Sequence, residues 1–104
     1  MRVQPQESSG QPLSGSSAAP AGIALDALER HRDGIVLGLK PASSEQEKSL
    51  VLRLMEIGFL PGEMVRVLAT GFPGADPLAI RVGQATFALR RDEAAFVLVQ
   101  PARS

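Results

Sequence analysis

The chain has 104 residues, of which 44% are hydrophobic, and its 11 basic and 11 acidic side chains give a formal net charge of zero. It contains no cysteine, which excludes disulfides, thiolate zinc sites, iron–sulfur clusters and thiol catalysis. Zero net charge also disfavours a dedicated nucleic-acid binder, because such domains usually carry a basic excess.

Residues 1–21 are rich in Ser, Gly, Pro, Gln and Ala, with Val3 and Leu13 as the larger apolar groups within the stretch. Such a segment buries too little surface to offset the entropy of ordering it. We expect a disordered N-terminal tail over 1–21, a folded domain over 22–101 and a C-terminal tail over 102–104. A recognition arm for a partner is the alternative for the first segment. The sequence shows neither a secretory signal nor a membrane span, so we expect a soluble, cytoplasmic protein.

The folded part begins with a short apolar segment and a polar turn. Leu25 and Leu28 fit either a short strand or a single helical turn. Residues 30–34 form the polar turn, in which Gly34 is a natural site for a positive φ. Residues 35–40 are then predicted to form a strand.

A helix is predicted next, because its start, its apolar face and its end are all marked. Ser44 and Glu47 have the spacing of a capping box. Gly58 can adopt the left-handed conformation that ends a helix, and Phe59 is then placed to contact Leu54. Three apolar residues recur with helical spacing: Leu50, Leu54 and Ile57.

The second half of the domain is predicted to be mostly strands joined by tight turns. Alternating apolar residues indicate strands over 64–70, 78–82 and 85–90, a single helical turn over 91–94 and a closing strand over 96–99. Gly83-Gln84 favours a tight hairpin between two of them. We therefore predict a mainly β fold, a small SH3-like barrel of about five strands with one short α-helix, in which closure removes exposed sheet edges.

No catalytic constellation is present, so we predict that the protein is not an enzyme. His31 is the only histidine, and a serine nucleophile would need it as its base. His31 and Asp33 lie close together in the polar turn and are weak candidates for a transition metal site, alone or shared across a dimer. An ordinary solvated turn is the alternative, because Fe(II) sites commonly use two histidines and a carboxylate.

Two further features have both a functional and a structural interpretation. Arg66, Arg81 and Arg90 should point away from the barrel core, where they form either a basic patch or ordinary surface charge balanced by acids. The loop 71–77 lacks the lysine and the following helix of a phosphate-binding loop. Its Phe72 is either an exposed contact for a partner or a cover over an open end of the barrel.

Several motifs together resemble the FeoA family, the small cytoplasmic partners of the bacterial ferrous iron transporter FeoB. The resemblance runs from about Ile23 to Val99. The family's opening pattern L-x-x-L-x-x-G-x-x-G-x-V is matched through Leu25, Leu28, Gly34 and Val36, with His31 in place of the first glycine. The remaining motifs are R-L-M-E-I-G-F-L-P-G-E-M-V-R-V, D-P-L-A-I-R-V and F-A-L-R-R.

The resemblance implies an SH3-like accessory module of a ferrous iron uptake system. It would dock on the cytoplasmic GTP-binding domain of FeoB and reach the membrane only through FeoB. The family is associated with transition metals, but no ligand set transfers to this sequence, and no cofactor is assigned. The candidate partner contacts lie at the helix end and on a second loop expected to face it: Leu54, Met55, Gly58, Phe59, Leu60, Pro61 and Gly62, with Phe72 and Asp76.

Three alternatives stay open at this point. Barrels of this kind also end iron-dependent repressors, which suggests a regulatory domain. A small-barrel nucleic-acid binder is another alternative, although the chain has no Trp or Tyr to stack on bases. An exposed strand edge would also allow a weak homodimer.

Overall fold

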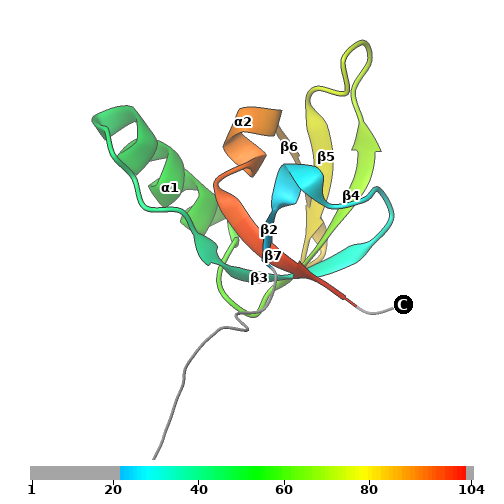
Figure 1. Ribbon diagram of the computed structural model, residues 1–104, viewed down its shortest axis with the longest axis horizontal. Coiled ribbons are helices and arrows are strands. Elements are labelled where there is room, and N and C mark those ends of the chain that lie inside the picture. The colour runs from blue at the N-terminus through cyan, green and yellow to red at the C-terminus, as the bar shows by residue number, and fades with distance from the viewer. Residues whose placement is uncertain (1–21, 103–104) are drawn as a thin grey trace, which may run out of the picture.

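A computed structural model describes residues 22–102. The segments in which apolar residues alternate form the strands of one antiparallel sheet, to which a helix is attached (Figure 1). The tail predicted over residues 1–21 lies outside the described residues. The elements in chain order are β2 (Ile23–Ala24), the 3-10 turn η2 (Leu25–Ala27), β3 (Asp33–Leu39), α1 (Glu45–Ile57), β4 (Met64–Thr70), β5 (Leu78–Val82), β6 (Ala85–Leu89), α2 (Arg91–Ala94) and β7 (Val97–Pro101).

The sheet has six strands in the order β2-β7-β3-β4-β5-β6. The strand beyond the five predicted is β2, which has two residues and is followed at once by η2. The first apolar segment therefore contains both the short strand and the single helical turn that were considered for it. Irregularities in the β3–β7 and β4–β5 ladders help to bend the sheet into a barrel. No hydrogen-bonded ladder joins β2 to β6 in the described part, so the sheet keeps two edges. The prediction that closure removes the exposed sheet edges is therefore wrong.

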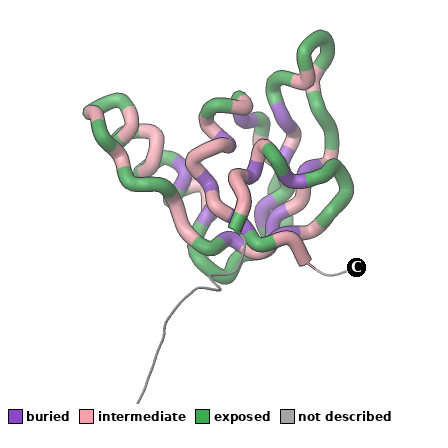
Figure 2. The backbone as a smooth tube through the Cα atoms, in the orientation of Figure 1, coloured by how far each residue is buried: buried purple, intermediate pink, exposed green. Residues whose placement is uncertain are grey.

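Buried residues alternate with more exposed ones along β4 and β5, and buried segments gather in the middle of the fold (Figure 2). Because alternate residues of a strand point to opposite faces, the core lies on the inner face of the curved sheet. No polar or charged residue within 22–102 is buried, as expected for a small apolar core. The buried strand residues are Val36, Val65, Val67, Leu78, Ile80, Val82, Leu89, Val97 and Val99.

Helix α1 begins at the predicted cap and ends at the predicted glycine. The Ser44 hydroxyl accepts a hydrogen bond from the backbone N–H of Glu47 at 3.1 Å. Glu47 itself reaches back to Ser43 rather than to Ser44, and accepts bonds from the Ser43 N–H and hydroxyl, both at 2.8 Å. At the other end Gly58 has φ 123°, and its N–H donates to Met55 while the N–H of Phe59 donates to Leu54. This bond pair is the predicted Schellman ending.

Only the C-terminal half of α1 packs against the barrel. Leu54 is its one fully buried residue, and Leu50 and Ile57 are partly buried against the core. The other half projects away from the sheet (Figures 1 and 2). No helix among residues 22–102 is long and apolar enough to cross a membrane.

The predicted polar turn differs from the structure in its detail. Gly34 lies within β3 and is not the residue with positive φ; that residue is His31, with φ 69°. Gly34 is instead packed closely, because a Cβ placed there would lie 3.2 Å from the Leu28 side chain. Strand β3 starts earlier than predicted because Asp33 and Gly34 pair with β4, a partnership that no local pattern reveals.

The last strand also extends further than predicted, to Pro101, because Gly34 of β3 pairs with that residue. Ala102, the first residue of the predicted C-terminal tail, is bonded to the fold. Its N–H donates to the carbonyl oxygen of Asp33 at 2.8 Å.

Candidate functional site

The turn after α1 holds most of the predicted contact residues, and backbone bonds fix it against β3. The N–H of Gly62 donates to the carbonyl oxygen of Val36 at 2.8 Å, and the N–H of Val36 donates to Glu63 at 2.9 Å. Leu60 is 43% exposed, and Pro61 is exposed beside it. A rigid turn with an outward leucine is the kind of surface that a partner can bind.

Two of the predicted contact residues are not available to a partner. Leu54 and Phe59 are fully buried in the core, where they anchor α1 and the turn from inside. Met55, in contrast, is 44% exposed on the outer side of α1. The predicted contact residues therefore include some that build the turn from inside and others that are exposed on its surface.

The loop between β4 and β5 presents Phe72, which is 96% exposed. Of the two interpretations of this residue, the cover over an end of the barrel is therefore wrong. The loop closes on itself through the Gly71 N–H, which donates to the Pro77 carbonyl oxygen at 2.7 Å. Gly71 is required at its position because a Cβ would run into the carbonyl group of Asp76.

Arg91, at the start of α2, holds this loop in place. Its guanidinium donates to the carbonyl oxygens of Ala75 at 3.1 Å and Asp26 at 2.9 Å. Its backbone N–H donates to the Asp76 carboxylate at 3.0 Å, which is a capping interaction at the first residue of the short helix. Asp76 therefore fixes the loop, and Arg91 is a supporting residue whose role the sequence did not reveal.

The turn 58–62 and the loop 71–77 do not face each other, contrary to the prediction. They lie at opposite ends of β4 (Figure 1), a strand of seven residues that rises about 3.3 Å per residue. Their separation is therefore on the order of 20 Å. The turn and the loop are therefore two separate surfaces.

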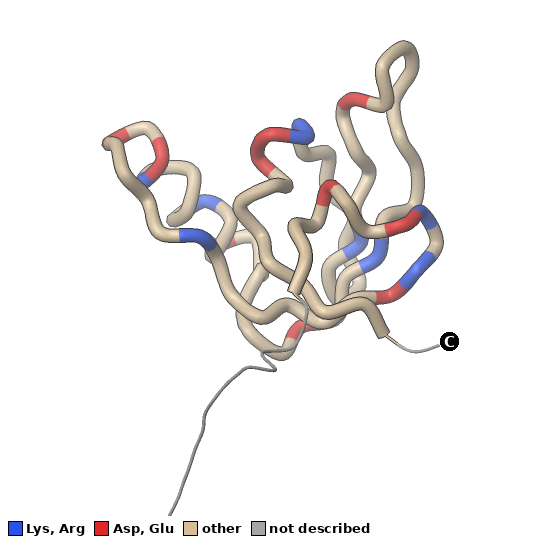
Figure 3. Tube along the Cα trace, in the orientation of Figure 1, with Lys and Arg blue, Asp and Glu red and all other residues tan. Residues whose placement is uncertain are grey.

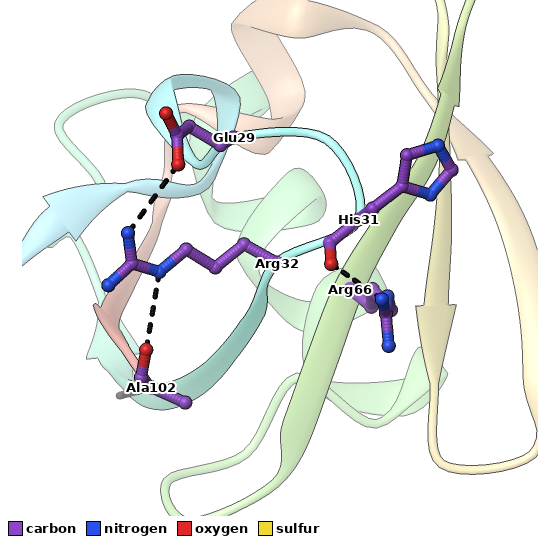
Figure 4. A network of polar contacts seen from close by, with 5 residues as sticks. All are labelled: Glu29, His31, Arg32, Arg66 and Ala102. Carbon is purple, nitrogen blue, oxygen red and sulfur yellow. Dashed lines mark hydrogen bonds and ion pairs between the residues drawn. The ribbon is translucent and has the colours of Figure 1, made fainter. Parts of the chain in front are cut away.

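The predicted metal candidates, His31 and Asp33, both lie beside Arg66. Asp33 lies 3.5 Å from the Arg66 guanidinium, whose other nitrogen donates to the His31 carbonyl oxygen at 2.6 Å. The His31 ring points away from this guanidinium (Figure 4). Within residues 22–102 no group of three His, Cys, Asp or Glu side chains is placed to hold a metal ion.

Figure 3 shows acidic residues interleaved with the basic ones. Arg66 pairs with Asp33, and Arg53 pairs with Glu93 at 2.6 Å. Burial raises the pKa of the Glu93 carboxyl, but hydrogen bonds from the Arg90 N–H and the Arg53 guanidinium outweigh it and hold that pKa below its ordinary value. Of the three arginines in the predicted patch, Arg66 alone forms an ion pair among the described residues, and Arg81 lies opposite it on β5. Both interpretations, a basic patch and ordinary surface charge, therefore stay open.

A cleft of about 580 Å³ separates α1 from α2, a feature that sequence reasoning missed. Leu50 and Phe96 are half-buried along it, and Arg53 and Glu93 join its two sides. The cleft exists because α1 packs only through its C-terminal half. No local pattern predicted this tilt.

The chain is similar to known proteins over most of its length. The FeoA domain family model matches residues 23–101. No curated protein sequence matches the chain. Among solved structures, FeoA from Stenotrophomonas maltophilia, crystallised with zinc, is 37% identical with a TM-score of 0.65; the match covers 73% of this chain and 87% of that one. The FeoA-like protein from Clostridium acetobutylicum is 26% identical with a TM-score of 0.68, and the match covers 80% of this chain and 90% of that one.

A second group of structures shares the fold. A manganese-dependent transcriptional repressor in complex with manganese is 21% identical with a TM-score of 0.69. That match covers 81% of this chain but 38% of the repressor. The Stenotrophomonas protein is described as an SH3 domain protein, so the predicted fold, mainly β and SH3-like with one short α-helix, is confirmed.

Proposed function

We infer the function from one premise: this chain belongs to the FeoA family, which is linked to bacterial ferrous iron transport. We propose that it is an accessory and regulatory binding module of a ferrous iron uptake system. The module acts in the cytoplasm by docking on the GTP-binding domain of FeoB, and it is peripheral to the membrane only through FeoB. It binds and biases its partner and carries out no catalysis of its own.

The observation that best supports a docking role is the exposure of Phe72 on a braced loop. An aromatic side chain that is 96% exposed contributes nothing to the core. The bonds from Arg91 fix the loop beneath it, so little entropy is lost when a partner closes over the ring. Exposed aromatic anchors of this kind often dominate interface energies.

The turn after α1 supplies a second, separate surface with a smaller anchor. Met55 and Leu60 are exposed there, next to Pro61 and Gly62. Because this surface lies at the other end of β4, we assign it a secondary role that depends on the size of the partner.

Iron is the cargo of the proposed transport system and not a resident cofactor of this chain. One histidine and a carboxylate engaged by Arg66 do not make a stable Fe(II) site. Weak capture of a transition metal by His31 and Asp33 stays a prediction, and the proposed docking function does not require it.

The proposal is tested by titrating the labelled chain with the GTP-binding domain of its own FeoB and mapping NMR shifts. We expect shifts clustered around Phe72, with smaller or no changes near Leu60. The titration is repeated with a GTP analogue and with Fe(II), since either could be needed for contact. An absence of shifts under all these conditions would contradict docking on this domain.

A regulatory domain is the second candidate, supported by the shared fold of the manganese-dependent repressor. At 21% identity this likeness concerns the fold alone. The two functions are separated by a binding assay with promoter DNA in the presence of Mn(II) or Fe(II). Specific retention with a steep salt dependence would favour the regulator or a nucleic-acid binder.

A further inference from the structure

We propose that strand β6 is a self-association edge, which pairs antiparallel with β6 of a second copy of this chain. The two-fold axis passes midway between the Phe87 residues of the two copies, and the two sheets join into one continuous sheet. This inference does not depend on docking to FeoB, because it concerns a different strand and a different partner.

The outer edge of β6 has no partner within the described residues. β6 ends the sheet and pairs only with β5. The hairpin Val82–Ala85 has a two-residue loop in which Gly83 has φ 59°, so Val82 and Ala85 form the hydrogen-bonded pair that closes the turn. Alternation along the ladder then directs the backbone groups of Thr86 and Ala88 away from β5.

Unlike β2, the strand at the opposite edge of the sheet, β6 lacks the usual features that protect an edge from pairing. Such features are short length, a charge, a proline or a bulge. The opposite edge, β2, has two residues, whereas β6 has five, with the sequence Ala-Thr-Phe-Ala-Leu. Its ladder with β5 has no irregularity, in contrast to the β3–β7 and β4–β5 ladders.

The strand is complementary to itself in one register. Antiparallel pairing about Phe87 places Thr86 opposite Ala88 of the second copy, and Ala88 opposite Thr86 of the second copy. Both are exposed and small, and both direct their free backbone groups outward, so the two pairs make four hydrogen bonds across the axis. No charged side chain stands directly opposite another in this register.

The same register covers an aromatic ring that the monomer leaves half-buried. Phe87 packs against the core at the open edge, and the two-fold axis places the two Phe87 side chains in a close non-hydrogen-bonded pair. Arg81, an exposed cation on β5, lies one strand further in, opposite Thr86. The two Arg81 side chains are then about 14 Å apart or more, beyond the screening length of physiological salt.

The first test measures self-association and its location in the full chain. Sedimentation equilibrium over a wide concentration range gives the dimer constant, and amide exchange is followed at low and high concentration. We expect the Thr86 and Ala88 amides to become protected only at high concentration, whereas the Phe87 amide is protected throughout by β5. A monomer at all concentrations, or a dimer without these changes, would overturn the proposal. Protection that appears only on adding another protein would also overturn it, because the edge would then serve a different strand.

The second test uses charge variants at exposed positions that leave the core intact. In Thr86→Glu/Ala88→Glu, like charges stand opposite each other across the axis, and we expect the dimer to weaken about tenfold. In Thr86→Glu/Ala88→Lys, opposite charges meet instead, and we expect the affinity to return to within about threefold of the original. Gln46→Glu/Ser49→Glu, on α1, adds the same charge at a distance from β6 and should leave the dimer affinity unchanged. Equal affinity of the two edge variants would contradict this register.

Discussion

His31 adopts a backbone conformation that favours glycine, at the place where the family pattern has one. Its φ of 69° lies in the left-handed region, which costs a residue with a Cβ about 1 kcal/mol or more. The turn is held by backbone groups that any residue supplies: the His31 N–H donates to Val67 at 2.7 Å, and its carbonyl oxygen accepts from Arg66. The side chain itself adds no hydrogen bond within the described part.

We therefore predict that His31→Gly stabilises the fold by up to about 1 kcal/mol, since relief of this strain exceeds the added entropy of the unfolded glycine. Urea unfolding of the two proteins measures the difference. His31→Ala, which keeps the Cβ, is the control and should be nearly neutral. A loss of stability in the glycine variant would show that the imidazole has a structural role.

The two phenylalanines of the contact motifs should respond very differently to truncation. Phe59 is fully buried and Phe72 is 96% exposed. We expect Phe59→Ala to reduce the free energy of unfolding by about 3–5 kcal/mol and Phe72→Ala to change it by less than about 0.5 kcal/mol. Thermal unfolding of the two variants and of the native chain measures these changes in stability. Similar effects from both changes would mean that Phe72 packs against the barrel.

Among the secondary-structure elements, α1 depends on a carboxylate at its N-terminus. The Ser43 N–H, and secondly the Ser43 hydroxyl, donate to Glu47 and hold the pKa of this carboxyl below its ordinary value. A carboxyl whose pKa is lowered by folding stabilises the fold above its unfolded pKa. That contribution is lost as the pH falls from about 4.3 through the folded value.

We accordingly predict that the first turn of α1 frays on acidification through this window. NMR titration should place the Glu47 midpoint below the ordinary pKa of a glutamate. Glu47→Gln should remove the pH dependence of the Ser43 amide shift. A Glu47 midpoint at the ordinary glutamate value would contradict the observed cap.

The β4–β5 loop depends on α2 through a single side chain. Arg91→Lys retains the charge but cannot reproduce two guanidinium bonds to separate carbonyl oxygens. We expect a loss of about 1–3 kcal/mol and faster motion of residues 71–77, seen in NMR order parameters. Arg81→Lys, at an exposed site, serves as the control. An unchanged loop would show that the backbone alone holds it.

For the molecule as a whole, the sequence predicted what is encoded locally. The capping residues of α1, its glycine ending and the hairpin between β5 and β6 involve neighbours within a few positions, so their signals agree. The positions of β2 and β7 beside β3 depend on pairings between distant segments, which local patterns do not specify.

The candidate site was predictable in composition but not in arrangement. The sequence marks Phe72 and Leu60 as unusual loop residues, yet it cannot show that β4 separates them. It also does not reveal Arg91 as the residue that fixes the loop, because its partner Asp26 is 65 positions away. Burial of Leu54 and Phe59 likewise follows from three-dimensional packing.

Docking on FeoB through the braced Phe72 loop can be tested in solution by calorimetry. The affinity for the FeoB GTP-binding domain is measured for the native chain, for Phe72→Ala and for Leu60→Ala. We predict that Phe72→Ala weakens binding about 30-fold while folding normally, and that Leu60→Ala binds within about threefold of the native chain. Native affinity in Phe72→Ala would show that the partner does not bind this loop.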